Sequence, residues 1–66
     1  MRVLRLREVM HLTGLSRSTI YVYMNNERFP KSINLGARSV GWIEHEIEEW
    51  IEDKVRLRSG QSLSLN

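Results

Sequence analysis

Apolar side chains recur at helical spacing near the start of the chain, up to an early glycine. Leu6, Val9 and Leu12 each lie three residues apart, which places them on one face of a helix. This pattern predicts a first helix from about Leu6 to Thr13. Gly14 is expected to end it, because glycine adopts the left-handed backbone of a helix C-cap without steric cost.

A second helix is predicted directly after this turn. Ser16 can cap its start, because a serine hydroxyl accepts a hydrogen bond from a free amide of the first turn. Leu15 before the cap and Ile20 four residues after it have the spacing of a hydrophobic staple. The buried face of this helix comprises Ile20, Tyr23 and Met24. Residues 25–26, both asparagine, are expected to end the helix.

A β-hairpin is predicted next. Pro30 breaks the helical pattern, and apolar and polar residues then alternate on both sides of residues 36–39. With these residues as a four-residue turn, Leu35 would face Val40 and Ile33 would face Trp42. The apolar side chains that would then share one side of the hairpin are Ile33, Leu35, Val40 and Trp42. Loop length and alternation together predict a wing. Residues 2–6 also alternate and fit a short strand or an extended lead-in.

The last predicted element is an amphipathic helix. Its buried face has apolar residues at i, i+4, i+7 and i+8, namely Ile43, Ile47, Trp50 and Ile51. Acidic residues come early in this helix and basic residues late, as the helix dipole favours. We expect the helix to end near Arg56. The predicted fold is mainly α with a small β-hairpin: a winged helix-turn-helix of three helices plus a wing over residues 1–56, followed by a disordered tail at residues 57–66.

Size and composition argue against several kinds of site. The 66 residues suit one small domain, and no cysteine is present to form a disulfide or bind a metal. The two histidines are far apart in the sequence, so we expect neither a metal nor another cofactor. No apolar run approaches the roughly 20 residues of a membrane span, which predicts a soluble cytoplasmic protein. Without a nucleophile–base grouping or a Gly-rich phosphate loop, neither an enzyme nor a small-molecule site is expected.

Charge is divided along the chain. Residues 1–42 carry seven basic and two acidic side chains, a net charge of +5, whereas residues 43–54 carry six acidic and one basic, a net charge of −5. Such a division suggests one face that meets a polyanion and another that avoids it. The acidic residues could equally be the solvated side of the last helix.

The second helix carries the chemistry expected of a DNA-reading element. In a helix-turn-helix, the second helix lies in the major groove and its N-terminal residues contact the bases. The candidates are Arg17, Ser18, Thr19, Tyr21 and Val22. Arg17 can contact guanine through two hydrogen bonds or bind a phosphate. Ser18 and Thr19 can bind a phosphate or base edge, or only complete the cap. The Tyr21 hydroxyl can donate a hydrogen bond to the DNA backbone, or the side chain can be partly buried. Val22 can contact a thymine methyl group.

The predicted wing adds three candidates, Lys31, Arg38 and Ser39. Arg38 lies in the turn, from which it could reach an adjacent minor groove or a phosphate, or it could be only a turn residue. Trp42 and Trp50 could stack on bases, but their inward spacing predicts that they belong to the core.

The chain resembles the AlpA family of prophage transcriptional regulators, small winged-helix proteins related to MerR-like and phage-excisionase DNA-binding domains. The resemblance covers residues 2 to about 54. Its clearest motifs are Thr13-Gly-Leu-Ser-Arg-Ser-Thr-Ile-Tyr21, Arg28-Phe-Pro-Lys31 and Arg38-Ser-Val-Gly-Trp42. It implies a sequence-specific regulator that binds double-stranded DNA, is encoded by a prophage or genomic island, and activates an integrase or excisionase gene. The resemblance places the DNA contacts on Arg17, Ser18, Thr19, Tyr21, Lys31, Arg38 and Ser39. It does not place one on Val22, because many relatives have a basic residue at that position.

Two other functions fit the same residues. A recombination directionality factor would bend attachment-site DNA with this fold so that integrase excises the element. A protein-interaction module would instead use the acidic last helix to bind a basic partner such as integrase or a repressor. Self-association, or contact with an integrase, could accompany any of these functions.

Overall fold

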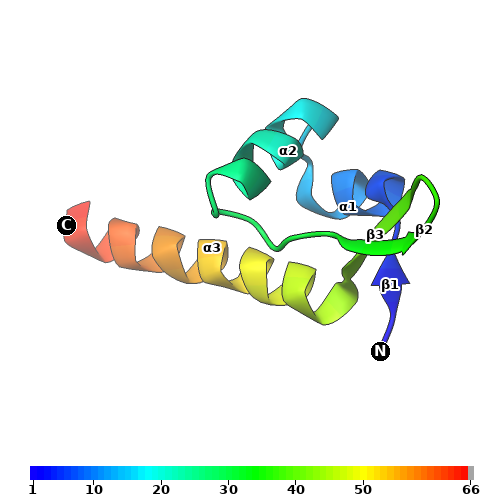
Figure 1. Cartoon of the computed structure of the whole chain (residues 1–66). Coiled ribbons are helices and arrows are strands. Elements are labelled where there is room, and N and C mark those ends of the chain that lie inside the picture. Colours follow the sequence, from blue (N-terminus) through cyan, green and yellow to red (C-terminus); the bar gives the residue numbers. More distant parts are fainter. Residues whose placement is uncertain (66) are drawn as a thin grey trace.

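Three helices and a three-stranded antiparallel sheet make up the computed structural model, which describes the backbone of residues 1–65 and the side chains of residues 1–58. In chain order the elements are β1 (Val3–Leu4), α1 (Leu6–Thr13), α2 (Arg17–Asn25), β2 (Ile33–Gly36), β3 (Ser39–Ile43) and α3 (Glu44–Leu65). In Figure 1, α1 lies between α2 above and α3 below, and the strands close one end of the molecule. This arrangement is a winged helix-turn-helix, as predicted, with β2, β3 and their turn as the wing.

The helix-turn-helix has the predicted bounds. α1 ends at Gly14, whose φ of 74° is left-handed, and the Gly14 amide donates to the Met10 carbonyl at 2.8 Å. At the start of α1, the Glu8 carboxylate accepts a hydrogen bond from the Arg5 amide at 3.0 Å. α2 ends at Asn25, and Asn26 is its C-cap. Local capping therefore sets both helices, because each end supplies a partner for backbone groups that the helix leaves free.

The sheet has the order β1-β3-β2, so the first strand of the chain pairs with the last. Val3 pairs with Ile43, and Leu4 pairs with Trp42. The Glu44 amide then donates to the Arg2 carbonyl at 2.9 Å, at the point where β3 passes into α3. The N-terminal segment is thus a strand that fastens the start of α3 to the rest of the fold.

The hairpin register differs from the predicted one. The observed pairs are Ile33–Gly41, Asn34–Val40 and Gly36–Ser39, with a bulge between Asn34 and Gly36. The turn consists of residues 37–38 rather than four residues, and Leu35 is the extra residue at the bulge. A one-residue change of register moves side chains to the other face of a strand. Ile33 and Leu35 are consequently exposed, at 38% and 44%, instead of sharing a buried face with Trp42.

The core draws one or more residues from nearly every element. Its buried members are Leu4, Val9, Ile20, Phe29, Trp42 and Ile47. Trp42 is the largest of them and is fully buried, which confirms its predicted place in the core. Its indole N–H has no hydrogen-bond partner among the described residues. Tyr23 and Met24 pack against this cluster from α2, also as predicted.

α3 differs from its predicted bounds at both ends. Ile43 is the last residue of β3, and the helix begins at Glu44. Its backbone continues past Arg56, the predicted end, to Leu65. The division into a folded domain at residues 1–56 and a disordered tail at 57–66 stays a prediction, and Asn66 lies outside the described residues. Within the described part of the chain, no helix combines the length and apolarity needed to cross a membrane.

Gly41 permits the close approach of β1 to β3. A Cβ atom on Gly41 would overlap Cγ1 of Val3 and lie 3.0 Å from the Leu4 carbonyl oxygen. Replacing Gly41 with alanine should lower the free energy of unfolding by about 1–3 kcal/mol, because the strand pair must move to relieve the overlap. Urea unfolding followed by circular dichroism measures this loss.

Combining Gly41→Ala with Val3→Ala provides the control. The double variant should recover part of the loss, because the closest overlap disappears while the backbone contact with Leu4 persists. An unchanged unfolding midpoint in Gly41→Ala would contradict the close packing of these strands.

Candidate nucleic-acid interface

Ser16 fixes the start of α2 and the orientation of its first turn. Its Oγ accepts a hydrogen bond from the Thr19 amide at 3.2 Å and donates to Thr19 Oγ1 at 2.8 Å. The Ile20 amide donates to the Ser16 carbonyl at 3.1 Å. Ile20 is fully buried, and Leu15 packs against the same core cluster. Capping and burial on one side leave the opposite side of α2 facing outward.

Most of the predicted residues of α2 lie on that outward face. Arg17, Ser18 and Val22 are exposed, and Tyr21 is half-buried. Thr19 is also half-buried, and its hydroxyl is already bonded to Ser16. The structure therefore gives Thr19 a role in the helix cap, whereas its contact with DNA stays a prediction.

The sequence reasoning missed Asn25 as a member of this face. It is exposed at the last position of α2, and it follows Ser18 and Val22 at helical spacing. An asparagine amide can contact adenine through paired hydrogen bonds. The spacing i, i+4, i+7 from Ser18 is the signal in the sequence that indicates it, whereas the asparagine pair by itself predicts only a helix end.

The wing presents its basic residue at the tip. Arg38 is exposed and has a φ of 61°, a left-handed conformation that is uncommon for residues other than glycine and asparagine. Lys31 is exposed in the segment that leads into β2. Ser39 is half-buried at the start of β3, opposite Gly36. The tip of the wing is therefore formed around Arg38.

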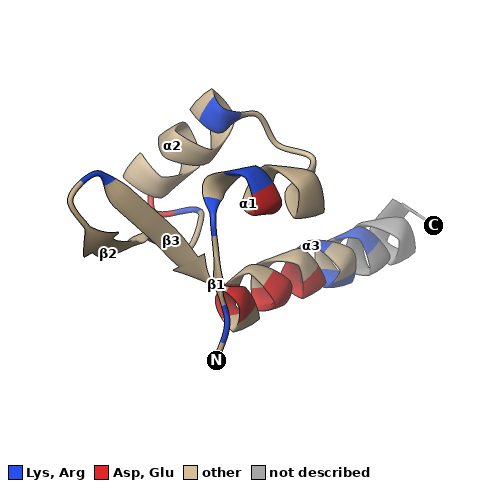
Figure 2. Cartoon of the chain, turned by 90° about the vertical axis from the view of Figure 1, so that its right-hand side faces the viewer, with Lys and Arg blue, Asp and Glu red and all other residues tan. Residues whose placement is uncertain are grey.

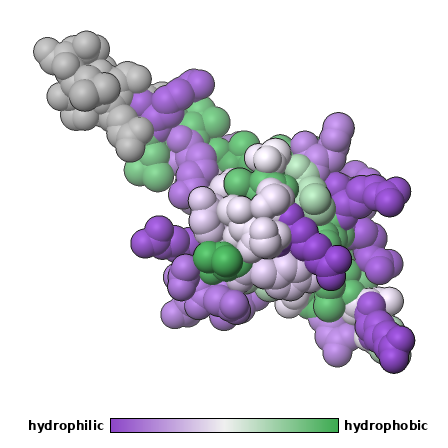
Figure 3. Space-filling view, turned by 90° about the horizontal axis from the view of Figure 1, so that it is seen from above, coloured by the Kyte–Doolittle hydropathy of each residue, from purple (hydrophilic) through white to green (hydrophobic). Residues whose placement is uncertain are grey.

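Acidic and basic side chains are separated in space as well as in sequence. Figure 2 shows acidic residues along the first part of α3, whereas the start of α2 and the turn between β2 and β3 are basic and lie away from α3. α2 itself carries no acidic residue. Seen from above α2, the surface is mostly of intermediate hydropathy with hydrophilic side chains around it (Figure 3). Such a surface can approach a polyanion while the carboxylates of α3 stay away from it.

One basic residue counted in the sequence does not belong to this face. Arg2 Nη2 lies 2.6 Å from Glu8 Oε2, and Arg2 Nη1 lies 3.1 Å from Glu44 Oε2. Arg2 therefore joins β1 to α1 and to the start of α3. No local pattern indicates these partners, because the three residues meet only through the pairing of β1 with β3.

The second tryptophan combines packing with hydrogen bonding. Trp50 is half-buried, and its Nε1 donates to the Arg28 carbonyl at 2.7 Å. Its ring meets that of Phe29 edge-on, with the centroids 4.9 Å apart. The inward orientation predicted for Trp50 is thus confirmed. Among the described residues, no group of three or more histidine, cysteine, aspartate or glutamate side chains could hold a metal.

A family model described as prophage CP4-57 regulatory protein (AlpA) matches residues 2–57. The chain belongs to the AlpA family. DNA-binding transcriptional activator AlpA of Escherichia coli (strain K12) is 45% identical over 62 residues, which cover 85% of this chain and 89% of that protein. Uncharacterized protein ORF88 of Enterobacteria phage P4 is 44% identical over 54 residues, covering 82% of this chain and 61% of that protein. The AlpA match includes both helices of the helix-turn-helix, the wing and the first part of α3.

Proposed function

We propose that this AlpA-family regulator binds double-stranded DNA and activates transcription from a promoter of the prophage or genomic island that encodes it. The genes that it controls are those of an integrase or excisionase, and it acts on the nucleoid in the bacterial cytoplasm. Support comes from the relative in Escherichia coli, which is named as a DNA-binding transcriptional activator. The function needs no catalytic group, metal or cofactor.

One observation carries the proposal: Arg17 and Arg38 are both exposed, at the start of α2 and at the tip of the wing. α2 enters the major groove, where the fork of Arg17 reads guanine and Ser18, Tyr21 and Val22 contact neighbouring bases or the backbone. The wing lies over the adjacent strand, where Arg38, Lys31 and Ser39 contact phosphates or the minor groove. The acidic part of α3 stays away from the DNA.

Footprinting on the DNA of the element tests where the protein binds. A protected site at one promoter supports the transcriptional function. Tandem sites beside the integrase recognition core would instead support a recombination directionality factor, which needs the same fold but bends attachment-site DNA. Loss of protection at raised salt is expected in both cases, because phosphate contacts release counterions.

Arg38→Gly separates function from stability at the wing. Glycine tolerates the left-handed backbone at this position, where an L-residue is disfavoured by roughly 1–2 kcal/mol. Thermal unfolding should therefore show a fold that is unchanged or up to about 1 kcal/mol more stable, since glycine also increases the entropy of the unfolded chain. DNA binding should weaken, and the slope of log K against log salt should fall by about 1, as expected for one lost phosphate contact.

Arg58→Ala is the matched control for this loss of charge. Arg58 is exposed on α3, far along the chain from the proposed interface. Its removal should leave the salt slope unchanged. If the salt slope of Arg38→Gly equalled that of the unmodified chain, the wing tip would not contact a DNA phosphate.

A further inference from the structure

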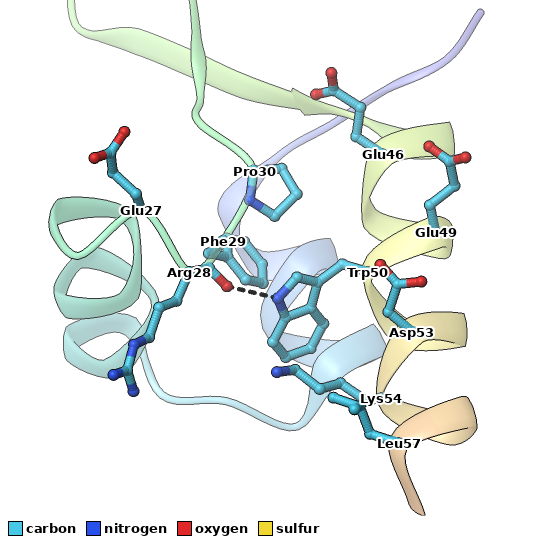
Figure 4. A pocket seen from close by; sticks show the side chains of 10 residues that line it. All are labelled: Glu27, Arg28, Phe29, Pro30, Glu46, Glu49, Trp50, Asp53, Lys54 and Leu57. Atoms are coloured by element: carbon cyan, nitrogen blue, oxygen red, sulfur yellow. Dashed lines mark hydrogen bonds between the residues drawn. The ribbon is translucent and has the colours of Figure 1, made fainter. Parts of the chain in front are cut away.

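A groove runs between α3 and the segment that follows α2, on a different surface from the proposed DNA interface. Its floor is formed by Phe29 and Trp50. Its lining carries four carboxylates and two cations, so acidic groups prevail: Glu27, Glu46, Glu49 and Asp53 against Arg28 and Lys54. Figure 4 shows the indole of Trp50 against the Arg28 carbonyl, with acidic side chains spread above it along α3. We call this surface the acidic groove. Aromatic rings below and carboxylates at the rim suit a segment that is both apolar and basic.

The last described side chains of α3 have that combination. Leu57 lies at the end of the acidic groove with 56% of its surface exposed. Arg56 and Arg58 flank it and are exposed, and Lys54 Nζ lies 5.1 Å from the centre of the Trp50 ring. This part of α3 projects beyond the other elements (Figure 1), which gives the molecule principal extents of 50 × 24 × 19 Å. A single projecting helix gains little stability without a packing partner.

We propose that the acidic groove binds the projecting part of α3 from a second copy of this chain, in an antiparallel arrangement related by a two-fold axis. Each copy then supplies one acidic groove and one basic, leucine-bearing helix segment, so the interface is self-complementary. The acidic first half of α3 in one copy lies beside the basic second half in the other. The chain itself thus provides an occupant whose charge and apolar side chain match the acidic groove.

Helical spacing fixes which residues meet. Trp50 and Leu57 lie seven residues apart on one face of α3, and Glu49 and Arg56 lie seven apart beside them. An antiparallel pair centred near Asp53 places Leu57 of one copy on Trp50 of the other. The same alignment brings Arg56 of one copy to Glu49 of the other. Asp53 lies near the two-fold axis, where its charge is compensated by the ion pair that it forms with Arg56 of its own helix.

The mass of the full chain in solution tests the proposal. Two half-helices make a small interface, so sedimentation equilibrium should cover about 10 µM to about 1 mM, the range expected for weak association. The apparent mass should rise from one copy to two across this range. Leu57→Glu should weaken association at least tenfold, because it places a carboxylate against Trp50 in the acidic rim.

Val55→Glu is the matched control. Val55 lies on the opposite side of the same helix and has a similar exposure, 46% against 56% for Leu57. Its replacement should leave association unchanged. Equal weakening of association by both variants overturns the proposal. A monomer at every concentration also overturns it, and would indicate that the acidic groove binds a different basic partner.

Charge exchange tests the register. Glu49→Arg and Arg56→Glu should each weaken association. The double variant should recover part of the loss, since the pair between copies is re-formed with reversed charges while Asp53 loses its partner Arg56. Failure of the double variant to recover would exclude this alignment. Circular dichroism checks that each variant keeps its helices. Affinity for a short duplex with one site should be the same for Leu57→Glu and the unmodified chain, so loss of the dimer is distinguishable from loss of DNA binding.

Discussion

Replacing Trp42 with alanine is expected to unfold the domain. Trp42 is the largest fully buried side chain and pairs through its backbone with Leu4 of β1. Truncating a buried tryptophan to alanine costs about 3–5 kcal/mol, through lost apolar burial and the cavity left behind. A single core in a domain of this size supplies a net stability of only about 3–5 kcal/mol. Loss of the far-ultraviolet circular dichroism signal at room temperature is the expected measurement.

Trp42→Phe tests how far the loss depends on filling the volume at this position. Phenylalanine fills much of the space and removes an indole N–H that has no partner among the described residues. We therefore expect a folded variant that is less stable than the original chain but far more stable than Trp42→Ala. Val22→Ala, on the exposed face of α2, should change stability by no more than about 0.5 kcal/mol. A cooperative thermal transition in Trp42→Ala close to that of Val22→Ala would contradict the role of Trp42.

Arg17→Ala is expected to have the largest effect on DNA binding. Arg17 is exposed at the first position of α2, and the Ser16 cap sets the direction in which that turn presents it. Loss of a two-hydrogen-bond contact with guanine should cost about 1–3 kcal/mol, which is roughly a 5- to 150-fold increase in Kd. Fluorescence anisotropy with a labelled duplex from the protected site measures this change.

The nature of the contact is tested by Arg17→Lys. Lysine keeps the charge but lacks the planar fork, so it should restore general attraction to DNA without restoring discrimination between matched and mismatched sites. Full recovery with lysine would indicate a phosphate contact in place of a base contact. Arg58→Ala again serves as the control for charge alone. If Arg17→Ala bound DNA as tightly as Arg58→Ala, α2 would not be the reading helix.

Local sequence signals were sufficient for the helix-turn-helix. Gly14 ends α1 with a left-handed φ, and Ser16 caps α2 through the Thr19 amide, both as predicted. These features depend on a few neighbouring residues, so they can be recognised without knowledge of the fold. The candidate interface was also largely predictable, since Ser18 and Val22 lie on the side of α2 opposite the buried Ile20 and Arg17 is exposed at the first position of the helix.

The wing register was not predictable from alternation alone. Two alignments of the hairpin differ by a single residue, and the apolar pattern of Ile33 and Leu35 favoured the wrong one. β1 packs closely against Gly41 on one side of β3. On the other side, β2 pairs with β3 through the bulge that leaves Leu35 exposed. Both are tertiary contacts. No local pattern encodes a strand that arrives from the other end of the sequence.

The sequence by itself determined the two capped helices, the exposed basic candidates Arg17 and Arg38, the buried Trp42 and the family. Tertiary structure decided the order β1-β3-β2, the ion pairs of Arg2 and the acidic groove beside Trp50. The reason lies in the range of the interactions: caps and helical faces join residues within a few positions, whereas strand pairing and grooves join residues that only the complete fold brings together.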